Sequence, residues 1–370
     1  MKAISIGKRY EIYDDTLKAY DFLPAKTYCV RFAQMSGFYL DERTDLDVTE
    51  KIYGVHPEKA DKVMQAFGRV ERNLGVILSG DKGIGKSLFA RLLSSKAVAA
   101  GLPVIIIDQF YPGIASYIES IDQEAVFLFD EFDKTFGSVK IADREADPQA
   151  GLLSMFDGTS HGKKLFIITC NKLNRLNDYL VNRPGRFHYH FRFDYPSPTE
   201  ILEYLRDKLG TQYESEINKV ARFSKKVSLN YDCLRAISFE LSMGATFESA
   251  IQDLNIMNFG DERYNLTLHC QNGVRLHAEN CQMDMFNGTN LVYIRMEDDR
   301  ARNTVCISFR PSDCVYDSVQ DRMVLPAEML QLHGDDESFG DGDETAVQAY
   351  QPEYLSIIHT QKRNLHFLTA

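Results

Sequence analysis

Residues 80–87 read GDKGIGKS and match the pattern G-x-x-x-x-G-K-[ST] at every defined position. The apolar run 74–78 precedes this segment, and residues 88–93 after it have the apolar spacing of a helix. A strand, a glycine-rich turn and a helix in this order gather backbone N–H groups at a helix N-terminus, where they can surround nucleotide phosphates. The segment therefore predicts an α/β fold with a nucleotide-binding loop.

Each part of the loop has an expected contact with ATP or with Mg²⁺. Gly83 and Gly85 let the backbone approach the phosphates closely. Lys86 reaches the β- and γ-phosphates, and the hydroxyl of Ser87 binds Mg²⁺. The residues predicted to bind the nucleotide in this segment are Gly80, Asp81, Lys82, Gly83, Ile84, Gly85, Lys86, Ser87 and Leu88.

An acidic pair follows a second apolar run. Residues 125–129 are all apolar, which is typical of a central parallel strand, and they end in Asp130 and Glu131. Ligands of open α/β sheets bind at the carboxyl ends of such strands. We expect Asp130 to hold the Mg²⁺ shell and Glu131 to orient and deprotonate the attacking water. Asp133 and Lys134 are interpreted as local charge structure.

Two further segments carry polar groups suited to the same chemistry. The apolar run 165–170 ends at Asn171, whose amide can position the lytic water. Residues 182–187 read NRPGRF and hold Arg183 and Arg186 on a proline-glycine turn. The planar, permanently charged guanidinium suits phosphate, although surface arginines are also common.

The order of these motifs resembles the AAA ATPase module of the AAA+ superfamily over residues 52–254. The resemblance rests on GDKGIGKS, VFLFDEFD (126–133), FIITCNKL (166–173) and NRPGRF. The layout is similar to that of the mitochondrial inner-membrane AAA translocase of Rieske proteins. AAA proteins of tailed bacteriophages are similar in the same region.

The resemblance implies a role for several residues. Asn171 would be the sensor-1 residue, and Arg183 and Arg186 would be arginine fingers that act on the ATP of a neighbouring subunit. Tyr53 and Gly54 would lie near the adenine.

The resemblance also implies a small helical lid after residue 195. Arg235 would face the γ-phosphate from this lid as a sensor-2 residue, or it is an exposed helix arginine. His188 departs from the family pattern, which often has an acid after RPGRF.

Composition limits the location and the partners of the chain. No apolar run approaches the roughly 20 residues that a membrane span needs, and residues 1–15 lack the apolar core of a secretory signal. Seven cysteines without a C-x-x-C pair favour a cytoplasmic protein. The net charge is −11, and residues 261–370 hold 18 acidic against 9 basic side chains. An acidic region repels a phosphate backbone, which disfavours nucleic acid as a partner.

The flanking regions are rich in strand patterns. Residues 27–32 and 37–40 predict a strand pair around a turn at 35–37, which either selects a substrate or packs on the ATPase core. Residues 266–270 and 274–278 alternate and predict a hairpin whose three-residue loop has Gly273 in the left-handed conformation. That hairpin places Cys270 and His277 on opposite faces, which argues against a zinc site. Residues 334–344 predict an acidic loop.

The sequence as a whole predicts an α/β fold: a P-loop NTPase sheet of the AAA+ type with a helical lid, flanked by an N-terminal β element and a C-terminal antiparallel, barrel-like β domain. The expected boundaries are 1–50, 51–194, 195–259 and 260–370. We expect an ATP-hydrolysing homo-oligomer, a hexamer, that remodels or translocates a macromolecular client, with protein favoured, as a chaperone does. The alternatives are a nucleic-acid motor or loader in phage replication and a nucleotide-gated scaffold.

Overall fold

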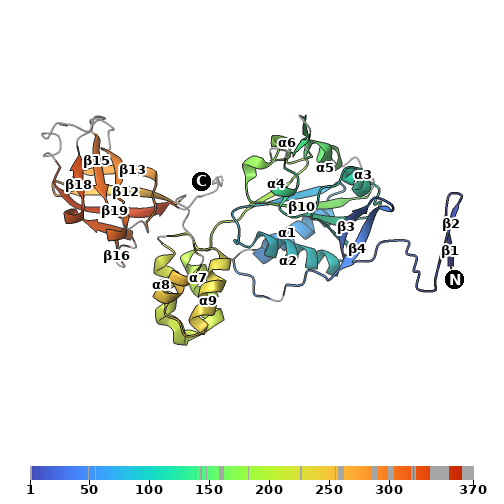
Figure 1. Ribbon diagram of the computed structural model, residues 1–370, viewed down its shortest axis with the longest axis horizontal. Helices are drawn as coiled ribbons and strands as arrows, with labels where there is room; N and C mark the ends of the chain where they lie inside the picture. The colour runs from blue at the N-terminus through green and yellow to red at the C-terminus, as the bar shows by residue number, and fades with distance from the viewer. Residues whose placement is uncertain are drawn as a thin grey trace. The chain divides into compact units, whose positions relative to one another are not determined.

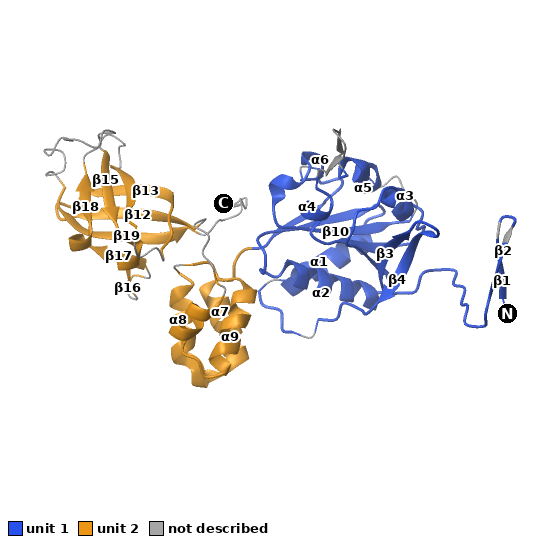
Figure 2. Cartoon of the chain, in the orientation of Figure 1, with its two compact units in different colours: residues 1–193 blue, residues 194–370 orange. Residues whose placement is uncertain are grey.

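The computed structural model divides the chain into two compact units, Met1–Phe193 and Asp194–Ala370 (Figures 1 and 2). The described residues are 2–48, 50–54, 56–137, 139–141, 144–146, 148–157, 162–181, 183–225, 227–254, 256, 262–285, 290–298, 304–317, 320, 322–333 and 350–360. The predicted acidic loop at 334–344, and Asn182 of the arginine turn, lie outside them.

A seven-stranded sheet forms the centre of the first unit. Its strands, in spatial order, are β11 (Tyr189–Arg192), β5 (Leu74–Ser79), β10 (Lys164–Cys170), β7 (Ala125–Phe129), β6 (Val104–Ile107), β3 (Thr27–Ala33) and β4 (Gly37–Arg43). All neighbouring pairs are parallel except β3 and β4. The three apolar runs that predict strands in the ATPase core, 74–78, 125–129 and 165–170, are confirmed as β5, β7 and β10.

The order of the strands explains why the motifs can meet. β10 is inserted between β5 and β7, so the ends of three neighbouring strands carry the glycine-rich loop, the amide of Asn171 and the acidic pair. Every residue of β5, β7 and β10 is buried, as expected for parallel strands covered on both faces. The carboxyl edge of these strands is where ligands of such sheets bind.

Helices cover both faces of this sheet. Figure 1 shows α1 and α2 on one face and α3 to α6 on the other. The bounds are α1 (His56–Arg69), α2 (Lys86–Ala99), α3 (Ile114–Glu119), α4 (Phe132–Thr135), α5 (Leu153–Phe156) and α6 (Asp178–Val181), with 3₁₀ turns at Ala150–Leu152 and Leu173–Arg175. A short antiparallel pair, β8 (Val139–Ile141) and β9 (Arg144–Ala146), lies between α4 and α5 in the sequence.

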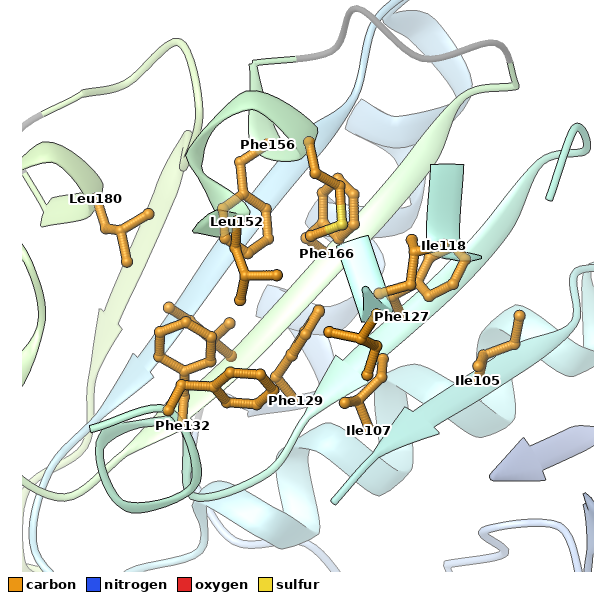
Figure 3. Close-up of a cluster of buried hydrophobic side chains, with 14 of the residues drawn as sticks. Ile105, Ile107, Ile118, Phe127, Phe129, Phe132, Leu152, Phe156, Phe166 and Leu180 are labelled. Atoms are coloured by element: carbon orange, nitrogen blue, oxygen red, sulfur yellow. The ribbon is translucent and has the colours of Figure 1, made fainter. Parts of the chain in front are cut away.

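A cluster of phenylalanines packs under α4 and α5 (Figure 3). Phe132, the first residue of α4, stacks on Phe136 with ring centroids 4.8 Å apart, and it packs edge-on against Phe129 of β7. Phe156 of α5 contacts Phe166 of β10 at 4.9 Å. Burial of each such ring contributes about 1.5–3 kcal/mol. Because α4 begins directly after the acidic pair, this packing also fixes the carboxyl end of β7.

The predicted strand pair near the N-terminus is part of the ATPase sheet. β3 and β4 pair in antiparallel register from Thr27 with Arg43 to Ala33 with Gly37, and β3 pairs in parallel with β6. Of the two expected arrangements, packing on the core is the one observed, so the sheet begins before the boundary at residue 50. A further hairpin, β1 (Lys2–Ile6) with β2 (Arg9–Tyr13), was not predicted.

The second unit begins with four helices: α7 (Pro198–Leu209), α8 (Glu214–Phe223), α9 (Tyr231–Ser242) and α10 (Phe247–Asp253), with a 3₁₀ turn at Thr211–Tyr213. Side-chain caps start three of them. Ser197 and Glu200 form a capping box on α7, Asn230 accepts from Cys233 N–H on α9, and Thr246 caps α10.

The rest of the second unit is an antiparallel sheet of eight strands. Their spatial order is β16 (Val315–Asp317), β17 (Arg322–Pro326), β19 (Pro352–Thr360), β12 (Arg263–Cys270), β13 (Arg275–Gln282), β14 (Val292–Asp298), β15 (Thr304–Phe309) and β18 (Gln331–His333). 3₁₀ turns lie at Pro311–Asp313 and Ala327–Met329. The predicted antiparallel β domain is confirmed. Within the described residues the outer strands β16 and β18 do not pair with each other, so hydrogen bonds do not close the ladder into a barrel.

The predicted bulged hairpin between β12 and β13 is confirmed. Leu268 pairs with Leu276, Cys270 N–H donates to the carbonyl of Val274 at 3.0 Å, and Gly273 has φ 79°. Cys270 is buried, whereas His277 pairs with Thr267 on the opposite face. Among the described helices of both units, none combines the length and the apolarity that a bilayer span requires.

Candidate functional site

The glycine-rich loop leaves β5 and ends at the first turn of α2. Gly80, Gly83 and Gly85 have φ values of 143°, 73° and 99°, which residues other than glycine rarely adopt. A Cβ at Gly80 would lie 2.4 Å from the carbonyl oxygen of Phe193. Gly85 is the N-cap of α2, so the unpaired N–H groups of that helix face the loop. The loop is therefore shaped to receive an anion.

The lysine of the loop is folded back onto the loop itself. Lys86 is only 7% exposed, and its Nζ donates to the carbonyl oxygens of Gly80, at 2.7 Å, and of Asp81. Burial lowers the pKa of this ammonium group. A phosphate would exchange these carbonyl contacts for a charge-assisted one. The side chain of Ile84 is buried and anchors the loop. The other described side chains of the segment are less buried: Asp81, Lys82 and Ser87 are exposed, and Leu88 is half-buried.

A threonine that the sequence did not single out holds the acidic pair in place. The Thr169 hydroxyl donates to Asp130 Oδ1 at 2.7 Å and accepts from the backbone N–H of Glu131 at 2.8 Å. Thr169 lies in β10 and is 2% exposed. The only sign in the sequence is a hydroxyl within an otherwise apolar run. One buried side chain thus connects the sensor strand to both acids.

Glu131 occupies a strained backbone conformation. Its φ and ψ are both 47°, which is left-handed and costs roughly 1–2 kcal/mol for a residue with a Cβ. Its carboxylate pairs with Lys134 and lies 3.4 Å from Nδ2 of Asn171. The hydrogen bond from Lys134 is the main reason why the pKa of Glu131 is lowered. The geometry brings the expected base and the expected sensor amide together.

Asp133 fixes the backbone of Asn171, the residue that carries that amide. It is buried, and its two carboxylate oxygens accept from the backbone N–H groups of Asn171 and Lys172 at 3.1 and 3.0 Å. Asp133 and Lys134 thus form local charge structure, as expected, and they have a further effect. Both act directly on the two residues that would handle the attacking water. Burial raises the pKa of the Cys170 thiol, next to this cluster, to about 12, which disfavours the reactive thiolate.

The structure separates the two arginines of the predicted finger pair. Arg183 is exposed, with its guanidinium 6.0 Å from the ring of Tyr179. Arg186 is 6% exposed and makes a bidentate pair with Asp157, and it also donates to the carbonyl of Tyr179 at 3.0 Å. The same pair lowers the pKa of Asp157. In this conformation only Arg183 is available to a neighbour, while Arg186 fastens the turn to α5.

Gly75 permits the close approach of this turn. It is the second residue of buried β5, and a Cβ there would be 2.3 Å from the carbonyl oxygen of Arg186 and 2.6 Å from Cδ1 of Phe187. A glycine inside a strand often marks such an approach of another backbone. His188 N–H then donates to the Gly75 carbonyl at 2.9 Å as the chain enters β11.

The segment predicted to lie near the adenine precedes α1. Tyr53 is buried, and Gly54 has φ 75° just before α1. His56, the first residue of α1, stacks on Phe193 at 4.8 Å, and Phe193 N–H donates to the carbonyl of Ser79 at 2.8 Å. This stacking ties the segment to the base of the loop.

Arg235 lies on α9 in the second unit. Its side chain is exposed, and it is 3.8 Å from Asp232 one turn earlier. A sensor role for Arg235 stays a prediction.

The oxygen groups at this edge fit Mg²⁺. A carboxylate such as that of Asp130 and a hydroxyl such as that of Ser87 are hard oxygen ligands, and Mg²⁺ usually takes one or two carboxylates together with phosphate oxygens. When bound, it would neutralise charge on the phosphates. The hydrogen bond from Thr169 to Asp130 uses one carboxylate oxygen, Oδ1.

Comparison with known proteins identifies this part of the chain. Residues 76–195 match the family model "ATPase family associated with various cellular activities (AAA)". The chain is 28% identical over 200 residues to the ATP-dependent zinc metalloprotease FtsH 1 of Alkaliphilus metalliredigens, covering 50% of this chain and 32% of the relative. It is 30% identical over 187 residues to the 26S proteasome regulatory subunit S10B homolog B of Arabidopsis thaliana, covering 46% and 47%. It is 24% identical over 182 residues to the cell division cycle protein 48 homolog of Archaeoglobus fulgidus, covering 45% and 25%.

These matches identify an AAA domain with the P-loop fold and support ATP hydrolysis as its activity. The chain spans between a quarter and about half of the length of these three relatives. The similarity therefore concerns the ATPase domain rather than the whole of any relative.

Proposed function

We propose that this chain is an ATP-hydrolysing AAA+ ring, a homohexamer, that uses ATP turnover to remodel or translocate a protein client. The observation that carries the proposal is the convergence at one sheet edge of the phosphate loop, an acidic pair and a sensor amide, while Arg183 is exposed. A ring places that arginine beside the ATP of the next subunit.

Each residue of the site has a proposed role in ATP binding or hydrolysis. The loop N–H groups and Lys86 bind the phosphates, and Ser87 and Asp130 hold Mg²⁺. Glu131, oriented with Asn171, takes a proton from the attacking water. Arg183 of the neighbouring copy offsets the charge of the transition state, which is worth roughly 10³–10⁵ in rate.

Three further groups assist this site. Arg186 keeps the finger turn in place through its pair with Asp157. Tyr53 and Gly54 border the adenine. Arg235 reaches the γ-phosphate from the helical lid.

The client class follows from charge and from the relatives. Those relatives bear the names of a metalloprotease, a proteasome subunit and a cell division cycle protein. This chain is acidic, with a net charge of −11, which repels nucleic acid. We therefore propose a protein client, handled as a chaperone does, in the cytoplasm. The motif layout also favours kinship with the mitochondrial Rieske-protein translocase and with phage AAA proteins. A phage origin would place the chain in the host cytoplasm.

Mixing two inactive variants tests the ring directly. Glu131→Gln lacks the base but supplies Arg183, and Arg183→Ala lacks the finger but supplies Glu131. Each variant alone should bind ATP and lose turnover, by roughly 10³-fold or more for Arg183→Ala. Their mixture should regain activity, because some interfaces combine an intact base with an intact finger. Arg175→Ala, at an exposed arginine of the preceding 3₁₀ turn, is the matched control and should keep its activity.

The mass of the particles gives the second readout. Mass photometry of Glu131→Gln should show a shift from small species to a ring mass when ATP·Mg²⁺ is added. A monomer that hydrolyses ATP briskly, with no gain of activity on mixing, contradicts the ring. Stimulation of turnover by DNA but not by an unfolded protein contradicts the protein client.

A further inference from the structure

The hairpin of β1 and β2 has no buried side chain in the part of the chain that the structure describes. Tyr10 is 72% exposed and Ile12 is 69% exposed, and the other described side chains of the hairpin are exposed or half-buried. A two-stranded hairpin by itself is at best marginally stable in water. Large apolar side chains on such a hairpin indicate a surface that is completed by another body.

An irregular segment joins the hairpin to the ATPase sheet. Residues 14–26 contain no helix or strand. The backbone of Leu23 is fastened to the side chain of Gln123 by two hydrogen bonds, of 2.7 and 3.2 Å, so residues 14–22 form the link between this point and the hairpin. Within the link, the carbonyl of Leu17 accepts a hydrogen bond from the ammonium group of Lys2. Fully extended, the link lets Tyr13 lie up to roughly 35 Å from Leu23. A compact body of the size of residues 27–193 is about 40 Å across. The hairpin can therefore reach a copy that lies against its own sheet domain.

The sheet domain offers a strand edge that suits a hairpin. β4 is the outer strand of the seven-stranded sheet, and its seven residues pair with β3 without a bulge. It contains no proline, and Tyr39 on it and Phe32 beside it are 46% and 43% exposed. Regular edges of this kind are templates for pairing with another chain. The charged residues at the end of β4, Asp41 to Arg43, restrict which chain can pair there.

The charges of the two surfaces are opposite. Residues 2–13 contain three basic side chains, Lys2, Lys8 and Arg9, against one acidic side chain. Residues 37–47 contain four acidic side chains against one basic side chain. Opposite potentials favour the encounter and set its register. Within one copy, however, β1 and β2 remain a sheet of their own and β4 remains an outer strand.

We propose that the β1–β2 hairpin of one copy docks on the outer edge of β4 of a second copy and links neighbouring subunits. This proposal rests on the homo-oligomer proposed above. It assigns the N-terminal residues a role as an exchanged arm, which is separate from the contact made by the arginine finger.

Photocross-linking identifies the partner of the hairpin. Tyr10 is replaced by p-benzoylphenylalanine in the full chain that also carries Glu131→Gln, and heavy-isotope-labelled and unlabelled copies are mixed before ATP·Mg²⁺ is added. Adducts should map to residues 37–47 and should join labelled to unlabelled chains. The same photoreactive residue at Tyr293, an exposed position of β14, is the matched control and should give no adduct with 37–47.

Two aspartates on the hairpin measure what the contact contributes. Tyr10→Asp combined with Ile12→Asp should raise the protein concentration needed for assembly about tenfold, as the loss of central apolar anchors does. The melting temperature should stay the same, because these side chains are outside the core. Met329→Asp, at an exposed apolar position of the second unit, should leave assembly unchanged.

The outcomes separate this proposal from the ring itself. Adducts within single chains only, or adducts outside residues 37–47 in particles of ring mass, overturn the exchanged arm and leave the ring standing. Unchanged assembly of the double aspartate variant overturns it as well. Absence of oligomers in the unmodified protein overturns both.

Discussion

Replacement of Thr169 by valine removes one hydroxyl and keeps the shape of the side chain. That hydroxyl is the shared partner of the Asp130 carboxylate and of the Glu131 backbone N–H. Valine fills the same space in β10, so the change tests hydrogen bonding rather than packing. Both acids of the proposed site should lose the group that positions them.

The expected loss of stability can be worked from the two contacts. A hydrogen bond to a charged group contributes about 1.5–3 kcal/mol, and an unsatisfied buried N–H costs about 1–3 kcal/mol. Asp130 is half-buried and regains part of its loss from water, so we expect a total of about 2–4 kcal/mol. For a unit of this size that lowers the melting temperature by roughly 5–15 °C.

Activity should fall further than binding. With Asp130 and Glu131 displaced, kcat should drop by at least about tenfold, while the affinity for nucleotide, set mainly by the loop, changes by only a few-fold. Thr169→Ser is the matched control, because it keeps the hydroxyl and loses only a methyl group. A valine variant with the melting temperature and kcat of the wild type, measured beside the serine variant, would refute the bridging role.

Three further changes address the arginine turn and the base. Asp157→Ala should lower the melting temperature at pH 7 more than Arg186→Met does, since it leaves a buried guanidinium without its carboxylate. The pKa of Asp157 is depressed in the folded protein. The difference in melting temperature between Asp157→Ala and the wild type should therefore vanish as the pH falls through that lowered pKa, which a series of thermal melts from pH 7 to pH 2 checks. Gly75→Ala places a methyl group 2.3 Å from the Arg186 carbonyl, so turnover should fall about 10²-fold in an ATPase assay while a fluorescent nucleotide still binds. Lys134→Gln removes the main group that lowers the pKa of Glu131, so the acid limb of a kcat–pH profile should move to higher pH, and an unmoved limb excludes the pair.

Much of the ATPase core could be predicted because its signals are local. The apolar runs at 74–78, 125–129 and 165–170 are continuous, and a strand buried on both faces requires such a run. The phosphate loop is a contiguous motif whose glycines directly report backbone conformation. In both cases neighbours in the sequence are also neighbours in space.

The supporting residues could not be predicted for the opposite reason. Thr169 acts on an aspartate 39 residues earlier, and Asp157 pairs with an arginine 29 residues later. Gly75 matters because of a backbone that returns more than a hundred residues later. Such pairings depend on the order of the strands, which no local pattern records. The hairpin at residues 2–13 was not predicted, because its described apolar side chains are not buried in a core and so leave no clear pattern in the sequence.

β5 connects the two halves of the proposed mechanism. Its carboxyl end carries the loop that holds phosphate, and Gly75, nearer its other end, supports the turn that carries Arg183. A buried strand within a packed sheet does not bend easily, because interiors have low compressibility. A movement of β5 in response to phosphate would therefore also displace Arg183, the finger proposed to serve the next subunit. The close contact at Gly75 is the part of this path that a single methyl group can disturb, which makes the alanine variant a test of coupling as well as of packing.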